Sequence, residues 1–228
     1  SGCGVVSAGS CVVADQAAYW MGQNGFFVYD GRVQPLRSAV GDFIFENLNV
    51  SQRSKVVGVL NSQFSEVVWF YPSTGSTEND SYVSYNYMEG HWQVGTLSRT
   101  AGFDTGTFVY PNYVDATGII YEHEAGYAYD SDTEVFAESG PIQLGNGDRM
   151  MVAKSLIPDE KTQGDVTATF KTRFFPNGTE SSFGPFDMAN PTSVRFQGRQ
   201  VQMRITGNTP TSWRVGTMRL DVVEGGRR

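Results

Sequence analysis

The stretch SEVVWFYPSTGSTENDSYVSYNYMEGHWQVGT, residues 65–96, predicts how the chain folds. It begins with an unbroken apolar run at 67–71, which is too short for a helix and rich in β-forming residues, as is typical of a strand buried on both faces. Pro72 ends this strand, and the polar segment after it is a loop. Residues 83–87 then alternate apolar with polar side chains, which is the period of a half-buried strand.

The residues on either side of this stretch extend the same pattern. Residues 88–90 form a glycine-containing turn into a further strand that starts at His91. Upstream, residues 55–60 predict a strand and residues 61–63 its turn. Residues 55–97 therefore predict four consecutive antiparallel strands. Such a sheet has two open edges and must bury a face against another layer, and stacking similar sheets around an axis is one solution.

The N-terminal part predicts a second meander and one helix. Asn24-Gly25 is a strong hairpin signal between two aromatic strands, and Asp30-Gly31 turns into a third strand at 32–36. Val5-Val6 and Val12-Val13 are strand candidates before them. A short helix is predicted within residues 39–50, since Val40, Phe43, Ile44 and Leu48 fall near helical spacing.

Aromatic strands and glycine turns recur further along the chain. Strands are predicted at 108–110, 119–124 and 127–129, and the repeat of roughly 40 residues has the size of a propeller blade. The predicted fold is therefore all-β, with β-propeller-like antiparallel meander blades in residues 1–140. Residues 141–228 predict longer alternating strands, a C-terminal antiparallel sheet that forms either the final blades or a small sandwich and closes or packs on the propeller.

The charge is distributed unevenly. The net charge is −7, but residues 195–228 hold seven Arg against Asp221 and Glu224, a balance of +5, so residues 1–194 carry −12. An acidic majority argues against a nonspecific grip on nucleic acid, yet it allows a surface past which DNA slides without sticking. No apolar run approaches 18 residues, so no membrane-spanning segment is predicted.

The sequence predicts no metal or cofactor. Cys3 and Cys11 are the only cysteines and are expected to be unpaired thiols. Together with His91 and His123 they lack the spacing of metal ligands. The chain begins with Ser rather than Met, so we expect a processed product or a piece of a longer protein.

Two motifs have acidic character, and neither predicts catalysis. In Glu122-His123-Glu124, a strand would point His123 away from both glutamates, and no nucleophile motif such as GxSxG accompanies them. Residues 130–134, DSDTE, resemble the start of a calcium loop but lack its glycine and its bidentate glutamate, so a solvated loop is expected. We therefore predict no catalytic, cofactor-binding or metal-binding residues and no enzymatic activity.

Five segments carry a resemblance to a known family: YWMGQNGFFVYDGRVQPL, QRSKVVGVLNSQFSEVVWFYPS, YVSYNYMEGHWQVGTLSRTA, IIYEHEAGYAYD and WRVGTMRLDVVEGGRR. In this order they resemble the C-terminal portion of tail proteins of short-tailed bacteriophages, of the tail nozzle (tubular tail protein B) and packaged-DNA stabilisation type. Members of that family are considerably longer, so this chain would lack an N-terminal portion that helps to close the propeller.

The resemblance implies a structural virion protein of the phage tail. It implies a propeller-containing nozzle or hub subunit, assembled in the host cytoplasm as a homo-oligomeric ring, usually a hexamer. The ring would lie below the portal and adaptor, next to tail fibre or spike proteins. It would form the conduit that retains DNA and ejects it without binding it specifically. We further expect the acidic excess to face the lumen and the arginines of the C-terminal part to face a neighbouring subunit, namely Arg199, Arg204, Arg214 and Arg219, with Arg227 and Arg228 beyond them.

Two other classes of protein remain open at this point. A propeller-type lectin or adhesin would stack sugars on exposed aromatic side chains, for which Trp20, Trp69 and Trp92 are the candidates, although packing in the core is the expected role of these residues. A glycoside hydrolase would use two acidic residues, for which candidate pairs exist among Glu122, Glu124 and Glu138. Neither alternative has a motif that singles out its residues.

Overall fold

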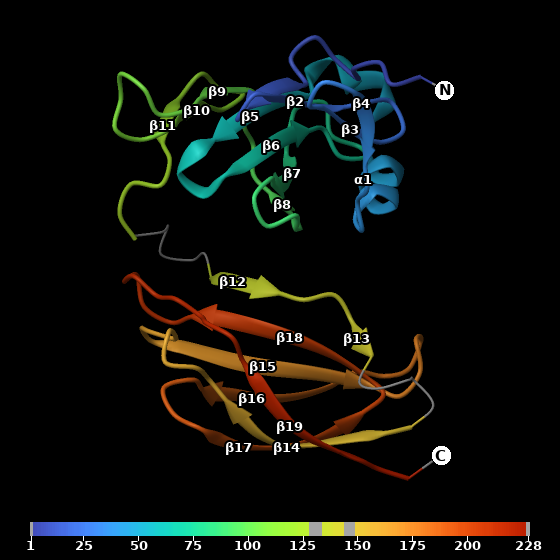
Figure 1. Cartoon of the computed structure of the whole chain (residues 1–228), viewed down its shortest axis with the longest axis vertical. Helices are drawn as coiled ribbons and strands as arrows, with labels where there is room; N and C mark the ends of the chain where they lie inside the picture. The colour runs from blue at the N-terminus through green and yellow to red at the C-terminus, as the bar shows by residue number, and fades with distance from the viewer. Residues whose placement is uncertain (1, 128–133, 144–148, 227–228) are drawn as a thin grey trace. The chain divides into compact units, whose positions relative to one another are not determined.

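A computed structural model describes residues 2–127, 134–143 and 149–226. The chain divides into two compact units, residues 1–125 and residues 126–228, and each is considered by itself. Antiparallel strands dominate both units, as the alternation in the sequence predicts, and no sheet closes on itself in the described part of the chain (Figure 1).

Unit 1 contains three antiparallel sheets in chain order, with neighbouring strands hydrogen-bonded in sequence. The strands of the first are β1 (Cys11–Ala14), β2 (Ala17–Met21), β3 (Phe26–Tyr29) and β4 (Val33–Leu36). The strands of the second are β5 (Val57–Asn61), β6 (Glu66–Tyr71), β7 (Ser81–Asn86) and β8 (Trp92–Thr96). The strands of the third are β9 (Ala101–Phe103), β10 (Asn112–Val114) and β11 (Ile120–Glu122). The four-strand meander predicted at 55–97 is thus confirmed, and so is the N-terminal meander, which gains β1 as a fourth strand.

The second sheet is buried on both faces, and strand β6 shows how. Trp69 and its alternate neighbours on one face belong to a core shared with the first sheet and helix α1 (Gly41–Asn47). Val68 and Phe70 on the other face pack with Tyr113 of the third sheet. The three sheets therefore form a stack whose middle layer contains the apolar run predicted to be a fully buried strand.

Close approach between the first two sheets depends on a glycine. The backbone N–H of Gly58 on β5 donates to the carbonyl of Gly9 at 2.8 Å. A Cβ at Gly58 would lie 2.5 Å from Val12 Cγ2 and 3.2 Å from the indole of Trp69. Only a residue without a side chain lets β1 and the Trp69 ring approach this strand together.

The short helix is confirmed, and its apolar side chains are divided between core and solvent. Helix α1 lies inside the predicted range, and Ile44 and Leu48 are buried against the first core, whereas Phe43 is exposed. A 3-10 turn, η1 (Val50–Lys55), then leads into the second sheet. Another, η2 (Ser62–Phe64), joins β5 to β6.

The strand predicted at 108–110 is wrong. These residues lie in the connection between β9 and β10, where Phe108 and Val109 are exposed, and the strand itself begins at Asn112. The apolar side chains of this segment lie on the surface and do not belong to a buried strand. The strand predicted at 119–124 is shorter than expected, because β11 ends at Glu122.

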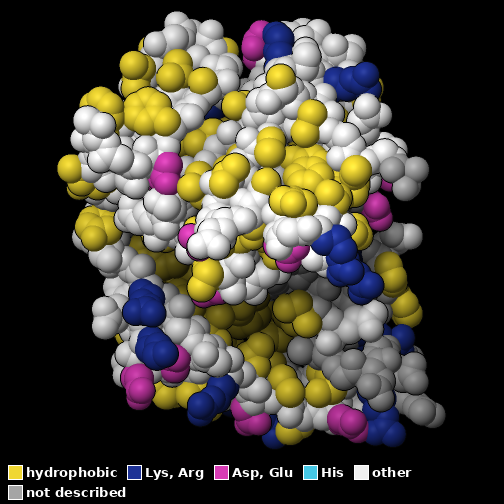
Figure 2. All heavy atoms as spheres, turned by 45° about the horizontal axis from the view of Figure 1, so that its top comes forward, with side chains coloured by type: hydrophobic (Ala, Val, Ile, Leu, Met, Phe, Trp, Pro, Cys, Tyr) yellow, Lys and Arg dark blue, Asp and Glu magenta, His cyan; other side chains and the backbone are white. Residues whose placement is uncertain are grey.

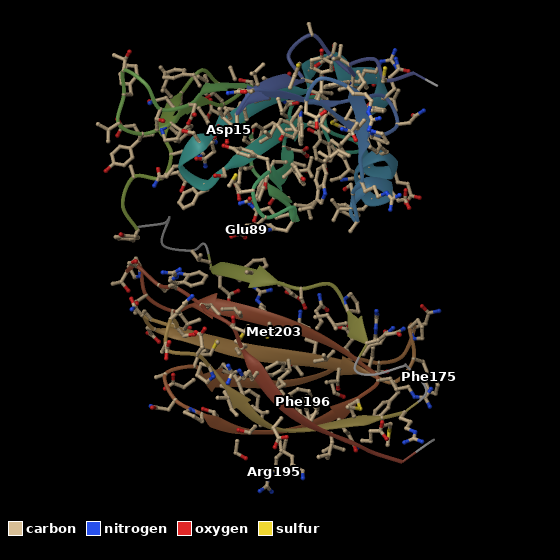
Figure 3. The ribbon with its side chains drawn as sticks, in the orientation of Figure 1. Asp15, Glu89, Phe175, Arg195, Phe196 and Met203 are labelled. Carbon is tan, nitrogen blue, oxygen red and sulfur yellow. The ribbon has the colours of Figure 1, made fainter. Side chains whose placement is uncertain are left out.

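Unit 2 packs two antiparallel sheets against one core, as the sandwich alternative predicts. The first contains β12 (Val135–Glu138), β13 (Ile142–Gln143), β15 (Val166–Arg173), β16 (Ser181–Asp187) and β18 (Gln200–Gly207). The second contains β14 (Met151–Ile157), β17 (Thr192–Gly198) and β19 (Arg219–Glu224). Phe170 and Phe196 meet between the sheets with ring centroids 4.7 Å apart, whereas Arg195, next to Phe196 on β17, points away from the core (Figure 3).

The boundary between the units differs from the predicted one. The sequence placed it after residue 140, but the structure divides the chain between Ala125 and Gly126. The reason is that β12 pairs along its length with β18, from Val135 opposite Gly207 to Glu138 opposite Arg204. Strand pairing across a gap in sequence is not visible in local patterns. The strand predicted at 127–129 falls mostly outside the described residues.

Trp69 supplies a direct test of the double burial of β6. Its side chain is 0% exposed, and its indole N–H donates to the carbonyl of Ser10 at 2.8 Å. Trp69→Ala should lower the free energy of unfolding by about 3–5 kcal/mol, the range for large-to-small core substitutions. Chemical denaturation measures the change, with the exposed Phe43→Ala as a control that should cost much less. A denaturation midpoint that hardly moves would place Trp69 outside the core.

Candidate functional site

A polar cavity of ≈ 130 Å³ opens between the second and third sheets of unit 1. It is called the Glu66–Glu124 cavity here, after its two carboxylates, and it combines oxygen-bearing side chains with aromatic rings. The residues that line it are Asn61, Glu66, Val68, Phe70, Tyr82, Ser84, Gln93, Leu97, Tyr113, His123 and Glu124.

Strand register gathers the polar side chains of the second sheet on one face. Asn61 on β5 lies opposite Glu66 on β6. Ser84 on β7 lies opposite Gln93 on β8 and, on its other side, opposite Val68 on β6. Since alternate residues of a strand share a face, all of them point to the same side of the sheet as Phe70.

The third sheet closes the cavity with residues that follow its last strand. Glu124 adopts a left-handed backbone conformation with φ of +61°, so the extended alternation stops there. His123 and Glu124 consequently line the same cavity, while Glu122 stays exposed on β11. The expectation that a strand would separate His123 from both glutamates is therefore wrong for Glu124, because the strand ends before it.

A chain of side-chain contacts fixes the position of His123. Asp115 accepts hydrogen bonds from the Thr117 hydroxyl at 2.7 Å and from the Tyr121 hydroxyl at 3.1 Å. The guanidinium of Arg99 lies 4.2 Å from the centre of the Tyr121 ring, and its Nε–H donates to His123 Nε2 at 2.9 Å. An imidazole that accepts at Nε2 carries its proton on Nδ1, so this bond requires neutral His123.

Three buried polar atoms at the cavity have no hydrogen-bond partner among the described residues. They are Asn61 Oδ1, Ser84 Oγ and Tyr113 Oη, on side chains that are 4%, 1% and 3% exposed. The other polar groups are only loosely paired, since Asn61 Nδ2 donates to Glu124 at 3.2 Å and Gln93 Nε2 donates to Glu66 at 3.3 Å. Buried polar atoms are normally paired, so three free ones at one cavity indicate room for a ligand.

Burial and mutual repulsion shift the titration of the cavity groups. Burial, and then the charge of Glu124, raises the pKa of Glu66; burial also raises the pKa of Glu124 against the lowering effect of its bond from Asn61. Burial, followed by the nearby Arg99, lowers the pKa of His123 to about 4. Burial and the charge of Glu124 raise the pKa of Tyr113. Each shift disfavours the charged form.

The cavity has acceptors in excess and no cation. No lysine or arginine is among the described residues that line it. The described part of the chain also holds no group of three or more His, Cys, Asp or Glu side chains placed to bind a metal ion. His123 is neutral and accepts a hydrogen bond from Arg99, so it adds no positive charge to the cavity. The cavity therefore suits binding of a positively charged group.

The other acidic candidates lie elsewhere. Glu138 accepts from Lys171 at 2.7 Å and from Arg204 at 3.0 Å, on the outer face of the first sheet of unit 2. These two bonds lower its pKa, which is opposite to what a catalytic acid needs. Of the segment 130–134, which is expected to be a solvated loop, residues 130–133 lie outside the described residues, and Glu134 pairs with Arg204.

The expected role of Arg204 needs correction, whereas two of the tryptophans have the buried role that the sequence favours. Arg204 pairs with Glu134 and Glu138 of its own unit and lies 3.6 Å from the centre of the Phe136 ring, so these contacts occupy it within the subunit. Trp20 and Trp69 are buried and cannot stack on a sugar, while Trp92 packs against Phe26 and other rings of the first core. Cys3 and Cys11 are both free and exposed.

A second surface feature lies on the outer faces of the stack. On the first sheet, the row Val13, Ala18, Tyr29 and Val33 crosses all four strands, and its three large side chains are exposed. On the third sheet, the row Ala101, Val114 and Ile120 crosses all three strands, with Ile120 65% exposed. Figure 2 shows hydrophobic side chains gathered over the β9–β11 part of unit 1. Each outer face of the stack therefore carries an apolar row that crosses its strands.

Comparison with models of known protein families finds no match, and neither does a search of curated proteins. Among the described residues, every helix is too short and too polar to cross a bilayer.

Sequence reasoning missed most of the cavity. The sequence predicts no role for Glu66, Asn61 and Ser84 beyond strands and turns. Among the residues of the cavity, it singles out Glu124 and His123 for chemistry. A signal is present in the sequence, since Glu66 directly precedes the strand predicted to be buried on both faces and Ser84 lies between aromatic residues of the next predicted strand. A polar residue at a buried position needs a partner or a ligand.

The neutral state of His123 gives a pH-dependent prediction. Its folded pKa of about 4 lies below the ordinary value of 6.5, so the unfolded chain binds a proton more readily between these values. Acidification from pH 7 to 4 should therefore remove stability, by about 1–2 kcal/mol for a half-buried imidazole after solvent screening.

Denaturation of the wild type and His123→Gln at both pH values measures this contribution. Gln keeps an acceptor for Arg99 and does not titrate, so the stability advantage of the wild type should shrink at pH 4. His91→Gln, which replaces the chain's other histidine on an exposed turn, is the matched control. If the wild type keeps the same stability advantage over His123→Gln at both pH values, His123 does not have the lowered pKa assigned to it.

Proposed function

We propose that the protein is a structural component of a bacteriophage virion, a nozzle or hub subunit of a short tail. In this proposal it assembles as a homo-oligomeric ring, a hexamer, beside the portal, adaptor and fibre or spike proteins, and DNA passes through the ring without specific binding. The observation that carries the proposal is the apolar row on each outer face of the three-sheet stack. The resemblance of the sequence to tail nozzle proteins supplies the context.

Two apolar outer faces favour continuation of the stack. Soluble proteins rarely leave large contiguous apolar patches in water unless they serve contacts. Stacking antiparallel sheets around an axis is how propellers cover such faces and protect sheet edges. We interpret the three sheets of unit 1 as successive blades, covered at both ends by further sheets of the assembled protein.

The proposed role requires no catalytic step. A conduit wall acts through its shape and its charge. The net charge of −12 on residues 1–194 suits a wall that repels a polyanion. Arg199, Arg214 and Arg219 remain the proposed contacts to a neighbouring subunit, whereas Arg204 serves within unit 2.

Assembly should depend on the apolar rows. The purified chain should sediment as a concentration-dependent oligomer, and Val13→Lys and Ile120→Lys should each shift it towards monomer because a charge is costly to bury in an apolar contact. Both positions are exposed, so thermal stability should change little. Gln23→Lys, on an exposed turn, is the control for added charge. A strictly monomeric chain at high concentration, or oligomers indifferent to both substitutions, would refute the assembly.

The phage context has a separate test. The reading frame that encodes this chain should lie among genes for portal, adaptor and fibre or spike proteins, and particles should contain the chain in their tails. A reading frame that instead encodes a secretion signal and a sugar-processing enzyme would favour the lectin or glycosidase alternatives.

Binding to duplex DNA should be weak. With its acidic majority, the chain should bind no more tightly than general nonspecific binding, for which Kd is about 10⁻⁴–10⁻⁶ M at physiological salt. Fluorescence anisotropy with a labelled duplex at two salt concentrations measures this, and a basic DNA-binding domain of similar size is the positive control. Tight and strongly salt-dependent binding would argue against a non-adhesive conduit.

A further inference from the structure

We propose that the Glu66–Glu124 cavity binds an ammonium group, supplied by a small alkyl amine or by a lysine side chain. Its oxygen atoms come from both layers that border the cavity, with Asn61, Glu66 and Ser84 on the second sheet and Tyr113 and Glu124 on or after the third. The cavity lies within unit 1, and its chemistry is independent of whether the protein belongs to a phage tail.

The hydrogen-bonding inventory favours a donor with positive charge. An ammonium group offers three N–H donors and no acceptor. Asn61 Oδ1, Ser84 Oγ and Tyr113 Oη are all unpartnered and able to accept, and two carboxylates add acceptors with charge. Asn61 Nδ2 and Gln93 Nε2 are already directed at the carboxylates, so their orientation presents oxygen to the remaining space.

The charge balance supports the same occupant. Two carboxylates in a half-enclosed space repel each other, and Glu124 contributes to the raised pKa of Glu66. Arg99, the nearby cation, is committed elsewhere, because its Nε–H donates to His123 and its Nη1 donates to the Ser98 carbonyl. A bound cation would favour the ionised form of both carboxylates, so binding should strengthen as the pH rises through their titration.

The walls and the volume favour an organic cation over a metal ion. Phe70, Tyr82 and Tyr113 line the cavity, with the Phe70 and Tyr113 rings in an edge-on arrangement at 5.7 Å. Aromatic rings suit alkyl groups and organic cations. A volume of ≈ 130 Å³ is more than one metal ion fills and less than a drug-sized ligand needs, but it accommodates an amine with a short alkyl chain.

Calorimetry with n-butylammonium chloride, the analogue of a lysine side chain, tests the proposal. We expect saturable binding that is weaker in acid, where the carboxylates are protonated, than at neutral pH. Glu66→Gln and Glu124→Gln should each weaken binding about tenfold or more, since each removes a charged acceptor. Glu122→Gln, which changes the exposed neighbour of the same motif, should bind as the wild type does.

A fourth variant separates binding from folding. Tyr113→Phe removes only the unpartnered hydroxyl and keeps the ring, so the fold should persist while affinity falls about threefold. Unchanged affinity of Tyr113→Phe together with unchanged affinity of both Glu variants would overturn the proposal, as would binding of K⁺ or Ca²⁺ in place of the amine. The proposal would also be overturned if n-butylammonium showed no binding up to about 10 mM, which is tenfold above the Kd of a weak site.

The source of the ammonium group is distinguished by a second ligand. A short peptide with one central lysine is compared with n-butylammonium, and an acetyl-lysine peptide is the control. Tighter binding of the lysine peptide supports a protein side chain as the occupant, whereas tighter binding of n-butylammonium supports a free amine. Equal binding of the lysine and acetyl-lysine peptides would show that the ammonium group is not recognised.

Discussion

The burial of strand β6 on both faces is the constraint on which unit 1 depends. Trp69 faces the first sheet and is hydrogen-bonded to Ser10, while Phe70, its direct neighbour, faces the third sheet and packs against Tyr113. Since successive side chains of a strand point to opposite faces, five apolar residues in a row require a layer on each side. The central position of the second sheet in the stack follows from this run.

The same physics explains how far the sequence determines the fold. Alternation and turn residues predict the strands of the first two sheets, because each hairpin is local and its turn is marked by Asn24-Gly25 or a similar pair. They fail at 108–110, where aromatic residues lie exposed in a connection. They also fail at the boundary between units, because β12 pairs with β18, far along the chain. Long-range pairing depends on complementary faces, which local patterns do not encode.

The candidate site was less predictable than the fold, for a backbone reason. Glu124 joins His123 at one cavity only because its φ is positive, and no residue type there predicts a left-handed conformation. Gly102 matters for a different backbone reason. A Cβ there would lie 2.4 Å from the Tyr113 ring, so only glycine allows this close approach. By contrast, Glu66 at the start of a doubly buried strand was visible in the sequence, and the stack explains its position as one wall of the cavity.

The cavity lies where an occupant would have the greatest effect on the stack. The third sheet has three strands of three residues each, and its main buried contact with the second sheet is Tyr113. An unsatisfied buried polar group costs about 1–3 kcal/mol, so a ligand that pairs these atoms would strengthen the interface that holds this thin layer. An ammonium group that donates hydrogen bonds to Glu66 on one layer and to Glu124 on the other would join them. Because the outer face of the third sheet carries the apolar row proposed for assembly, ligand binding and assembly would then be coupled, each favouring the other by the same free energy.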